Sequence, residues 1–131
     1  MFDDVGKFHA KFELPHRDPA RPPTILSDDV ALYRAAFLLE EALEFMRAHQ
    51  RNDMVEAADA LVDLVYVALG TAHLMNLPWD RLWDEVQRAN MLKERGATVK
   101  RGHALDVRKP PGWQPPNIAT ILLEAARRGN T

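Results

Sequence analysis

Two groups of carboxylates on neighbouring helical segments constrain this sequence more than any other feature. The first group is Glu40, Glu41 and Glu44, and the second is Glu56 and Asp59. At about 100° per residue, the three glutamates fall within roughly 100° of one helix face, while the second pair is one turn apart on the next helix. The link between the segments is short, so we expect an antiparallel αα-hairpin with the acidic rows facing each other.

The facing carboxylates predict a bound cation. Charged residues on a helix usually form a solvated face, but neither group contains the interleaved lysine or arginine that would relieve repulsion between like charges. Asp63, one turn after Asp59, has only apolar neighbours, and an unpaired carboxylate there needs a partner or a metal. Because all these ligands are oxygens, the expected cofactor is Mg²⁺ or Mn²⁺.

Size and composition restrict the class of protein. The chain has 131 residues, enough for one domain with a sizeable core, and its net charge of −2 does not indicate a nucleic-acid binder. It has no cysteine, which excludes disulfides and thiol chemistry and fits a reducing cytosol. It shows neither a signal peptide nor an apolar run long enough to span a membrane. We therefore expect a small soluble cytoplasmic domain without a nucleic-acid or membrane partner.

Apolar periodicity predicts an all-α fold, a four-helix-bundle-like protomer. Ser27 and Asn52 are the expected N-caps of the second and third helices. No segment alternates long enough to predict a strand. The expected helices cover residues 3–14, 28–50, 53–75, 79–95 and, after a proline-rich stretch, 117–128. We predict one domain over residues 1–131, with a helical core in 1–96 and an irregular extension in 97–131.

The apolar surface of these helices exceeds what one protomer can cover. The segment from Ala57 to Leu69 is apolar nearly all round apart from its carboxylates, and Trp79 and Trp83 add bulky surface. On the second helix, the expected buried side consists of Val30, Tyr33, Phe37, Leu38, Ala42, Phe45 and Met46. We therefore expect a homo-oligomer, most simply a dimer or a dimer of dimers.

Two later stretches offer polar groups for an anionic ligand. On the fourth helix the apolar stripe ends in Asn90 and Lys93, which would aim an amide and an ammonium inward; an ordinary exposed helix end is the alternative. The segment 97–116 has no clear period and is basic. Its basic residues are Lys100, Arg101, His103, Arg108 and Lys109. It is either a surface tail or a basic flap over the ligand.

Other uses of a carboxylate-rich bundle fit poorly. A di-iron site needs Glu-x-x-His on its helices, and the one such spacing, from Glu13 to His16, contains Pro15. A glycosidase needs two carboxylates at a sugar cleft rather than a row of them on adjacent helices. The chain also lacks a glycine-rich phosphate-binding loop, so any phosphate must bind through metal and side chains.

These motifs resemble those of a known group of enzymes. Glu-Glu-x-x-Glu at 40–44 followed by Glu-x-x-Asp at 56–59 is similar to the signature of the MazG-like all-α NTP pyrophosphohydrolase superfamily, which includes MazG, the dimeric dUTPases and phosphoribosyl-ATP pyrophosphohydrolase. Further stretches resemble its bacterial and phage MazG-like branch, namely residues 8–12, 58–67, 70–72, 88–93 and 109–116. The resemblance covers nearly the whole chain. It implies a location in the cytoplasm of a bacterial cell or of a phage-infected host.

The resemblance implies a role for each polar group. The metal ligands would be Glu41, Glu44, Glu56 and Asp59, holding two or more Mg²⁺ or Mn²⁺ ions per site. Glu40 would be the catalytic residue, which either supports a second metal or polarises the attacking water. Asn90 and Lys93 would bind phosphate oxygens. Asp63 offers a second register for the last metal ligand, so the choice between Asp59 and Asp63 stays open. The implied reaction cleaves a nucleoside triphosphate between its α- and β-phosphates, in a dimer or tetramer whose partner chains complete the site.

The base must be recognised outside the acidic cluster, and the first helix is the best candidate. Phe8 and Phe12 offer rings for stacking and His9 a polar edge, although core packing is the alternative for both rings. Phage relatives that cleave dGTP make guanine the first base to test. The rival to an enzyme is a non-catalytic helical oligomerisation or regulatory module with a structural metal, and pyrophosphate release separates the two.

Overall fold

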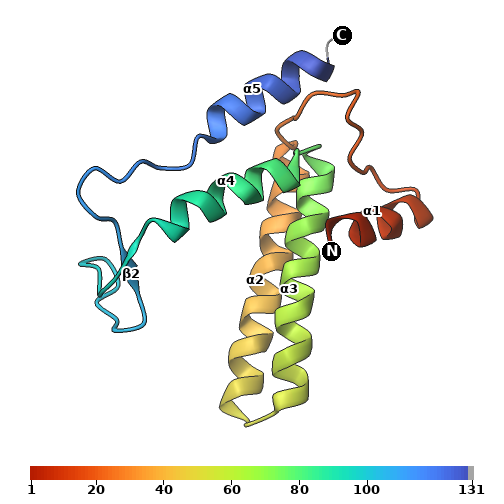
Figure 1. Cartoon of the computed structure of the whole chain (residues 1–131). Coiled ribbons are helices and arrows are strands. Elements are labelled where there is room, and N and C mark those ends of the chain that lie inside the picture. The colour runs from red at the N-terminus through yellow and green to blue at the C-terminus, as the bar shows by residue number, and fades with distance from the viewer. Residues whose placement is uncertain (130–131) are drawn as a thin grey trace.

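Two long antiparallel helices, α2 (Asp28–Gln50) and α3 (Met54–Leu74), form the hairpin on which the other elements are arranged (Figure 1). The computed structural model describes residues 1–129. The remaining elements are α1 (Phe2–Lys11), α4 (Trp79–Met91), β1 (Glu94–Arg95), β2 (Val107–Arg108) and α5 (Ile118–Gly129). The predicted all-α fold is confirmed, and β1 and β2 form only a minimal antiparallel pair. No helix in the described part of the chain is long and apolar enough to cross a membrane.

Local capping explains where the hairpin helices begin. The Ser27 hydroxyl accepts a hydrogen bond from the Val30 amide at 3.4 Å, as predicted, and α2 has the predicted bounds. On α3 the cap is Asp53, whose carboxylate accepts from the Glu56 amide at 3.0 Å. The prediction of Asn52 as the cap was wrong by one residue. Asn52 instead has a φ of 54°, the left-handed conformation that turns the chain between the helices.

Two other helices end earlier than predicted. α1 stops at Lys11 rather than Leu14, because Glu13 adopts a left-handed φ of 56° and the chain turns back onto the last helical turn. α4 stops at Met91 rather than near Arg95, because β1 leaves the helix direction to pair with β2. Both ends are set by contacts of the chain that follows the helix rather than by the helical pattern.

α1 is fastened to α3 through buried histidines. His73, near the end of α3, stacks on Phe2 with ring centroids 3.8 Å apart, and its Nε2 donates to the Phe2 carbonyl at 2.8 Å. Its Nδ1 accepts from the Arg17 amide at 2.9 Å, so the same ring also holds the loop after α1. Val5 and His9 are the buried residues of α1, with 2 % and 3 % of their surface exposed. These contacts hold α1 across the hairpin.

After α3, α4 runs away from the hairpin and α5 runs back toward the loop between α1 and α2 (Figure 1); we call residues 79–129 the arm. Within the arm, the indole Nε1 of Trp113 donates to the Ala89 carbonyl at 2.7 Å. An ion pair between Arg81 and Glu124 joins α4 to α5. The arm is therefore tied to itself more than to α2 or α3.

This arrangement leaves much apolar surface uncovered. Trp83, expected on the inward stripe of α4, is 57 % exposed, and Tyr33 and Met46 of α2 are 59 % and 47 % exposed although both were expected to be buried. The solvent-accessible area is 9699 Å², whereas a compact monomer of 14.9 kDa exposes about 7,000 Å². The predicted burial of Tyr33 and Met46 is wrong for a single protomer, because α4 turns away from the hairpin, whereas the exposure of Trp83 agrees with the excess apolar surface expected from the sequence.

Candidate functional site

A cavity lies where α1 crosses the α2–α3 hairpin. Its volume is about 380 Å³, within the range of small-molecule sites. The lining residues are Phe8, His9, Leu14, Tyr33, Arg34, Phe37, Glu41, Asp63, Tyr66 and Val67. The first three come from α1 and the turn after it, the next four from α2 and the last three from α3. Aromatic rings, an arginine and two carboxylates thus line the same cavity.

Glu41 carries a buried carboxylate oxygen, Oε2, without a hydrogen-bond partner among the described residues. Only 7 % of the residue is exposed, and within residues 1–129 its Oε2 is buried and accepts no hydrogen bond. Burial raises the pKa of the Glu41 carboxyl, and the nearby carboxylates of Glu44, Asp63 and Glu40 raise it further. A buried carboxylate in this state costs free energy unless a cation or a donor satisfies it. The position therefore fits a site that binds a cation.

The hairpin brings Asp63, rather than Asp59, to the cavity beside Glu41. All three acidic residues of α3 are exposed, but only Asp63 lines this wall, and Glu56 and Asp59 lie nearer the turn of the hairpin. The two helices meet antiparallel across a short turn, so each α2 position faces a fixed α3 position. Of the two aspartates that the sequence left open, the structure places Asp63 beside Glu41, and which of them binds metal stays a prediction.

The predicted cage of five carboxylates is not assembled in one protomer. No group of three or more His, Asp or Glu side chains in residues 1–129 is arranged closely enough to hold a metal ion by itself. The donors at the cavity are nevertheless of the right kind, because Mg²⁺ and Mn²⁺ prefer carboxylate oxygens and Glu41 Oε2 needs a cation or donor. Glu41 and Asp63 therefore fit a cation that takes further ligands from water, substrate or the neighbouring Glu44.

Arg34, a residue not singled out from the sequence, is the guanidinium group of this cavity. Its Nε donates to the Thr71 hydroxyl at 3.0 Å and its Nη2 to the Val67 carbonyl at 2.8 Å. The guanidinium lies 5.8 Å and 5.5 Å from the ring centroids of Tyr33 and Phe37. Burial lowers the pKa of Arg34, and Tyr33 opposes this shift. The available signal was an arginine flanked by aromatic residues two turns before the acidic motif.

The structure places Phe8 and His9, the base-binding candidates of α1, at the wall of the cavity. Phe8 is 42 % exposed and meets Tyr66 edge-on, with ring centroids 5.5 Å apart. His9 Nδ1 lies 2.7 Å from the Pro15 carbonyl. Because a carbonyl only accepts, Nδ1 carries the proton, and Nε2 is an acceptor in the neutral ring. Phe12 packs beside Phe8 but is 54 % exposed and lies outside the lining.

Gly70 lets Arg34 and His9 approach the backbone of α3. A Cβ at this position would lie 2.8 Å from Arg34 Nη2 and 2.9 Å from His9 Nε2, closer than a carbon atom can approach either nitrogen. A larger residue would therefore displace both groups. The same geometry makes the two nitrogens neighbours at one place on the wall.

The other predicted site residues lie on the arm, away from this cavity (Figure 1). Asn90 is exposed in the last turn of α4, and Lys93 Nζ lies 5.3 Å from the Trp113 ring centroid. Arg101, between β1 and β2, donates from Nε to the Asp106 carboxylate at 2.8 Å. One protomer does not bring these residues to its own cavity, because α4 runs away from the hairpin. Their phosphate-binding roles stay predictions.

Residues 5–90 match the profile of the phosphoribosyl-ATP pyrophosphohydrolase family. The matched segment covers 86 of the 131 residues and includes every residue that lines the cavity. Curated protein sequences gave no match. The family is part of the MazG-like all-α NTP pyrophosphohydrolase superfamily, so the relationship expected from the acidic motifs is confirmed. It points to a pyrophosphohydrolase that acts on a nucleotide. Acidic motifs, helical fold and profile agree that the chain belongs to the phosphoribosyl-ATP pyrophosphohydrolase family.

Proposed function

We propose that this chain is a metal-dependent nucleoside triphosphate pyrophosphohydrolase. It cleaves a (d)NTP between the α- and β-phosphates and releases a monophosphate and pyrophosphate. The observation that carries the proposal is the buried, unpartnered carboxylate of Glu41, in a cavity that Asp63 also lines and that is large enough for a small organic ligand. Family membership supports the hydrolysis of a phosphoric anhydride.

The charges of the site supply the reason for a metal requirement. A triphosphate carries about four negative charges, which Glu41 and Asp63 alone would repel. A divalent cation there would neutralise phosphate charge and make an attacking water more acidic. Glu41 and Asp63 would hold it with Glu44 beside them, and the exposed Glu40 would accept the proton of the water. The water oxygen then bonds to phosphorus as the bridging P–O bond breaks and pyrophosphate leaves.

Two candidate substrates are supported by different observations. Aromatic side chains of the cavity, among them Phe8, Phe37 and Tyr66, give stacking faces for a base, which favours a free deoxynucleoside triphosphate with dGTP as the first to test. The family match favours phosphoribosyl-ATP as the second candidate. Both would release pyrophosphate, so the organic product distinguishes them.

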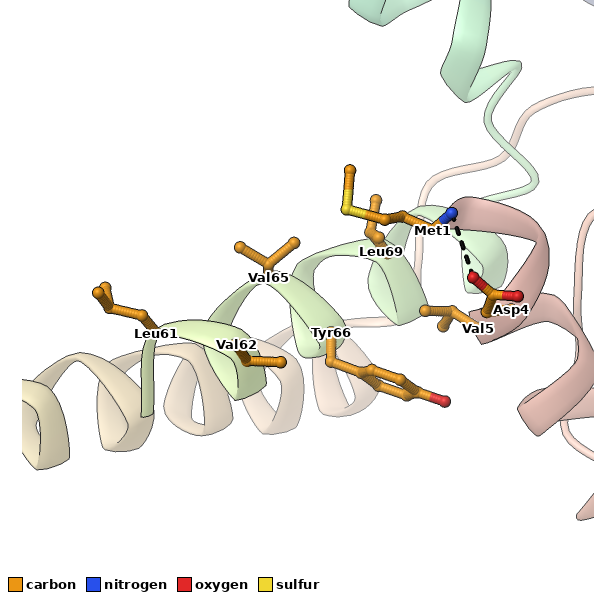
Figure 2. A pocket seen from close by; sticks show the side chains of 8 residues that line it. All are labelled: Met1, Asp4, Val5, Leu61, Val62, Val65, Tyr66 and Leu69. Atoms are coloured by element: carbon orange, nitrogen blue, oxygen red, sulfur yellow. Dashed lines mark ion pairs between the residues drawn. The ribbon is translucent and has the colours of Figure 1, made fainter. Parts of the chain in front are cut away.

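We further propose a homo-oligomer, a dimer or a dimer of dimers, in which a second copy covers α3. Leu61, Val62 and Val65 are 48 %, 63 % and 44 % exposed beside a second hollow, about 380 Å³ in volume, between α3 and the start of α1 (Figure 2). The chain exposes about 2,700 Å² more than a compact monomer of its mass, an amount in the range that obligate interfaces bury. Such an assembly would also give Asn90 and Lys93 a partner's cavity to reach.

Incubation of the full chain with Mg²⁺ or Mn²⁺ and a panel of dNTPs, NTPs and phosphoribosyl-ATP tests the enzyme. Pyrophosphate together with the matching monophosphate is the expected result. Orthophosphate together with a diphosphate would mean that a different bond is cleaved. No release from any substrate would overturn the proposal in favour of a non-catalytic oligomerisation or regulatory module.

A further inference from the structure

Two lysines of the arm gather on one indole ring. The ammonium nitrogens of Lys93 and Lys109 lie 5.3 Å and 5.0 Å from the centroid of the Trp113 ring, so the two charges are no farther apart than the sum of these distances. The ring itself is held in place, because its Nε1 donates to the Ala89 carbonyl in the last turn of α4 at 2.7 Å. Both lysines therefore share one fixed platform.

The pairing of β1 with β2 explains why the lysines meet. Glu94 pairs with Arg108 in an antiparallel register. One position further along the same register, Lys93 comes opposite Lys109, and side chains at opposite positions of an antiparallel pair lie on the same side. Like charges at opposite positions destabilise such a pair. The backbone thus brings together two positive charges that repel each other.

The acidic residues nearby do not relieve this repulsion. The segment 93–109 has six lysines and arginines but two carboxylates, and arginines take both carboxylates, in the ion pairs Arg101–Asp106 and Arg108–Glu94. Within residues 1–129 no carboxylate forms an ion pair with Lys93 or Lys109. The charge of the two lysines is therefore left for a ligand that is itself an anion.

We infer that Lys93, Lys109 and Trp113 form an anion-binding site that holds the phosphate chain of a diphosphate or triphosphate. Each ammonium donates charge-assisted hydrogen bonds to phosphate oxygens, and two neighbouring ammonium groups fit an anion with two linked phosphoryl groups better than a single orthophosphate. A phosphate chain between the lysines also replaces their repulsion with attraction to both.

This site lies outside the segment 5–90 that matches the family and outside the cavity. Lys93 was expected to bind phosphate beside the acidic cluster, whereas its neighbour in the structure is Lys109. The inference goes beyond the proposed hydrolysis, because binding at these lysines needs neither metal nor cleavage. Its ligand is either the triphosphate tail of a nucleotide or free pyrophosphate, which share the same linked phosphoryl groups.

Calorimetric titration of the full chain with sodium pyrophosphate in metal-free buffer tests the site. Without metal, the carboxylates of the cavity repel an anion, so binding reports on the arm. Pyrophosphate should bind at least about 10-fold more tightly than orthophosphate, because it can reach both ammonium groups. No binding of pyrophosphate, or equal affinities for the two anions, would overturn the inference.

Lys109→Ala separates this site from general attraction to a basic surface. The variant should bind pyrophosphate about 10-fold more weakly than the wild type, because one of the two ammonium groups is lost. Lys100→Ala is the matched control: Lys100 is an exposed lysine of the same segment without a contact to the Trp113 ring, and the variant should bind like the wild type. Equal losses in the two variants would overturn the inference.

Titrations with dGTP, dGMP and a short single-stranded oligonucleotide in the same buffer identify the ligand. dGTP binding more tightly than pyrophosphate would assign the site to the tail of a nucleotide, and the reverse order would assign it to free pyrophosphate. In either case dGMP, which has no phosphate chain, should bind more weakly. An oligonucleotide that binds more tightly than both, with the same loss in Lys109→Ala, would overturn the inference in favour of a nucleic-acid surface.

The same measurements keep this site separate from the proposed enzyme. Pyrophosphate binding in metal-free buffer that is lost in Lys109→Ala supports the site even where no nucleotide is hydrolysed. Metal-dependent pyrophosphate release from a nucleotide, combined with no metal-free binding of pyrophosphate, would keep the enzyme and overturn the site.

Discussion

Several arginines of the arm form ion pairs with carboxylates, whereas within residues 1–129 the charged side chains that line the cavity form none. In the arm, Arg88 pairs with the Glu85 carboxylate at 2.8 Å, and its hydrogen bonds, with one from the Asn117 amide, lower the pKa of Glu85 to about 2. In the cavity, the pKa of Glu41 is raised, because the carboxylate is buried and its charged neighbours are acidic. Arg34 in turn has no carboxylate partner among residues 1–129.

The difference indicates where a ligand acts. Exposed ion pairs contribute little stability and chiefly fix local geometry, as Glu85 does where it accepts from the chain before α5. Unpaired charges in a cavity destabilise the empty protein, so their presence in a hollow of this size points to a ligand that supplies the missing partners. Substitutions of the cavity residues should therefore alter activity, whereas substitutions of the ion-paired residues of the arm should alter local stability.

Removal of the metal should have the largest effect. EDTA should abolish turnover, and added Mg²⁺ or Mn²⁺ should raise the melting temperature, because a cation that binds the folded state stabilises it. Pyrophosphate release and thermal denaturation, each with and without EDTA, measure this. Full activity in EDTA would contradict a metal-dependent mechanism.

Glu41→Gln should lower kcat on the order of 10³-fold, because the buried carboxylate at the acidic end of the cavity is lost. In metal-free buffer the variant should melt no lower than the wild type, since it removes a repelling charge. Glu85→Gln in the arm is the control, with activity near that of the wild type. A large loss of apo stability in Glu41→Gln would show that the residue is structural.

Asp63→Asn and Asp59→Asn test which of the two aspartates acts together with Glu41. Asp63 lines the cavity with Glu41, whereas Asp59 does not line it. Asp63→Asn should therefore cost about 10²-fold in kcat/KM and Asp59→Asn clearly less. Steady-state kinetics on both purified variants give the comparison. A larger loss in Asp59→Asn would favour Asp59 as the direct ligand.

Val65→Lys should break the proposed assembly. The residue is 44 % exposed on the apolar face of α3, and a lysine there would place a charge in the interface. Light scattering should give a mass well above 14.9 kDa for the wild type and a smaller particle for the variant, with lower activity. A wild-type particle of 14.9 kDa at micromolar concentration would exclude the oligomer.

Phe8→Ala should have a smaller effect, on KM rather than on folding. Phe8 is 42 % exposed at the cavity, so its loss should raise KM for the nucleotide and cost less than the about 3–5 kcal/mol typical of a fully buried phenylalanine. Kinetics combined with urea denaturation separate the two contributions. Unchanged KM with a stability loss of that size would make Phe8 a core residue.

The smallest effect is a pair of opposite pH dependences in metal-free melting curves. Folding raises the pKa of Glu41, so its contribution to stability is present below pH 4.5 and is lost as pH rises through the folded value. Folding lowers the pKa of Glu85 from 4.5 to about 2, so its contribution is present above pH 4.5 and is lost as pH falls toward 2. In plots of melting temperature against pH, Glu41→Gln should remove the loss of stability at rising pH, and Glu85→Gln should remove the loss of stability at falling pH.

Features that depend on nearby residues could be predicted from the sequence. The bounds of α2 follow from the Ser27 cap and the periodicity of the helix, both of which are local. The acidic rows followed from spacing alone, and Phe8 and His9, chosen from the sequence as base-binding candidates of the first helix, line the cavity. The ends of α1 and α4 were missed by three to four residues, because the chain beyond each helix decides them.

Only the tertiary structure decided which of these residues share a cavity. The approach of Asp63 to Glu41 depends on the register of α2 against α3, and the sequence allowed Asp59 equally. Arg34 became a site residue through Thr71 and Val67, more than thirty positions away in the chain. The direction of the arm, and with it the distance of Asn90 and Lys93 from the cavity, is likewise set by contacts between distant segments, which no local pattern encodes.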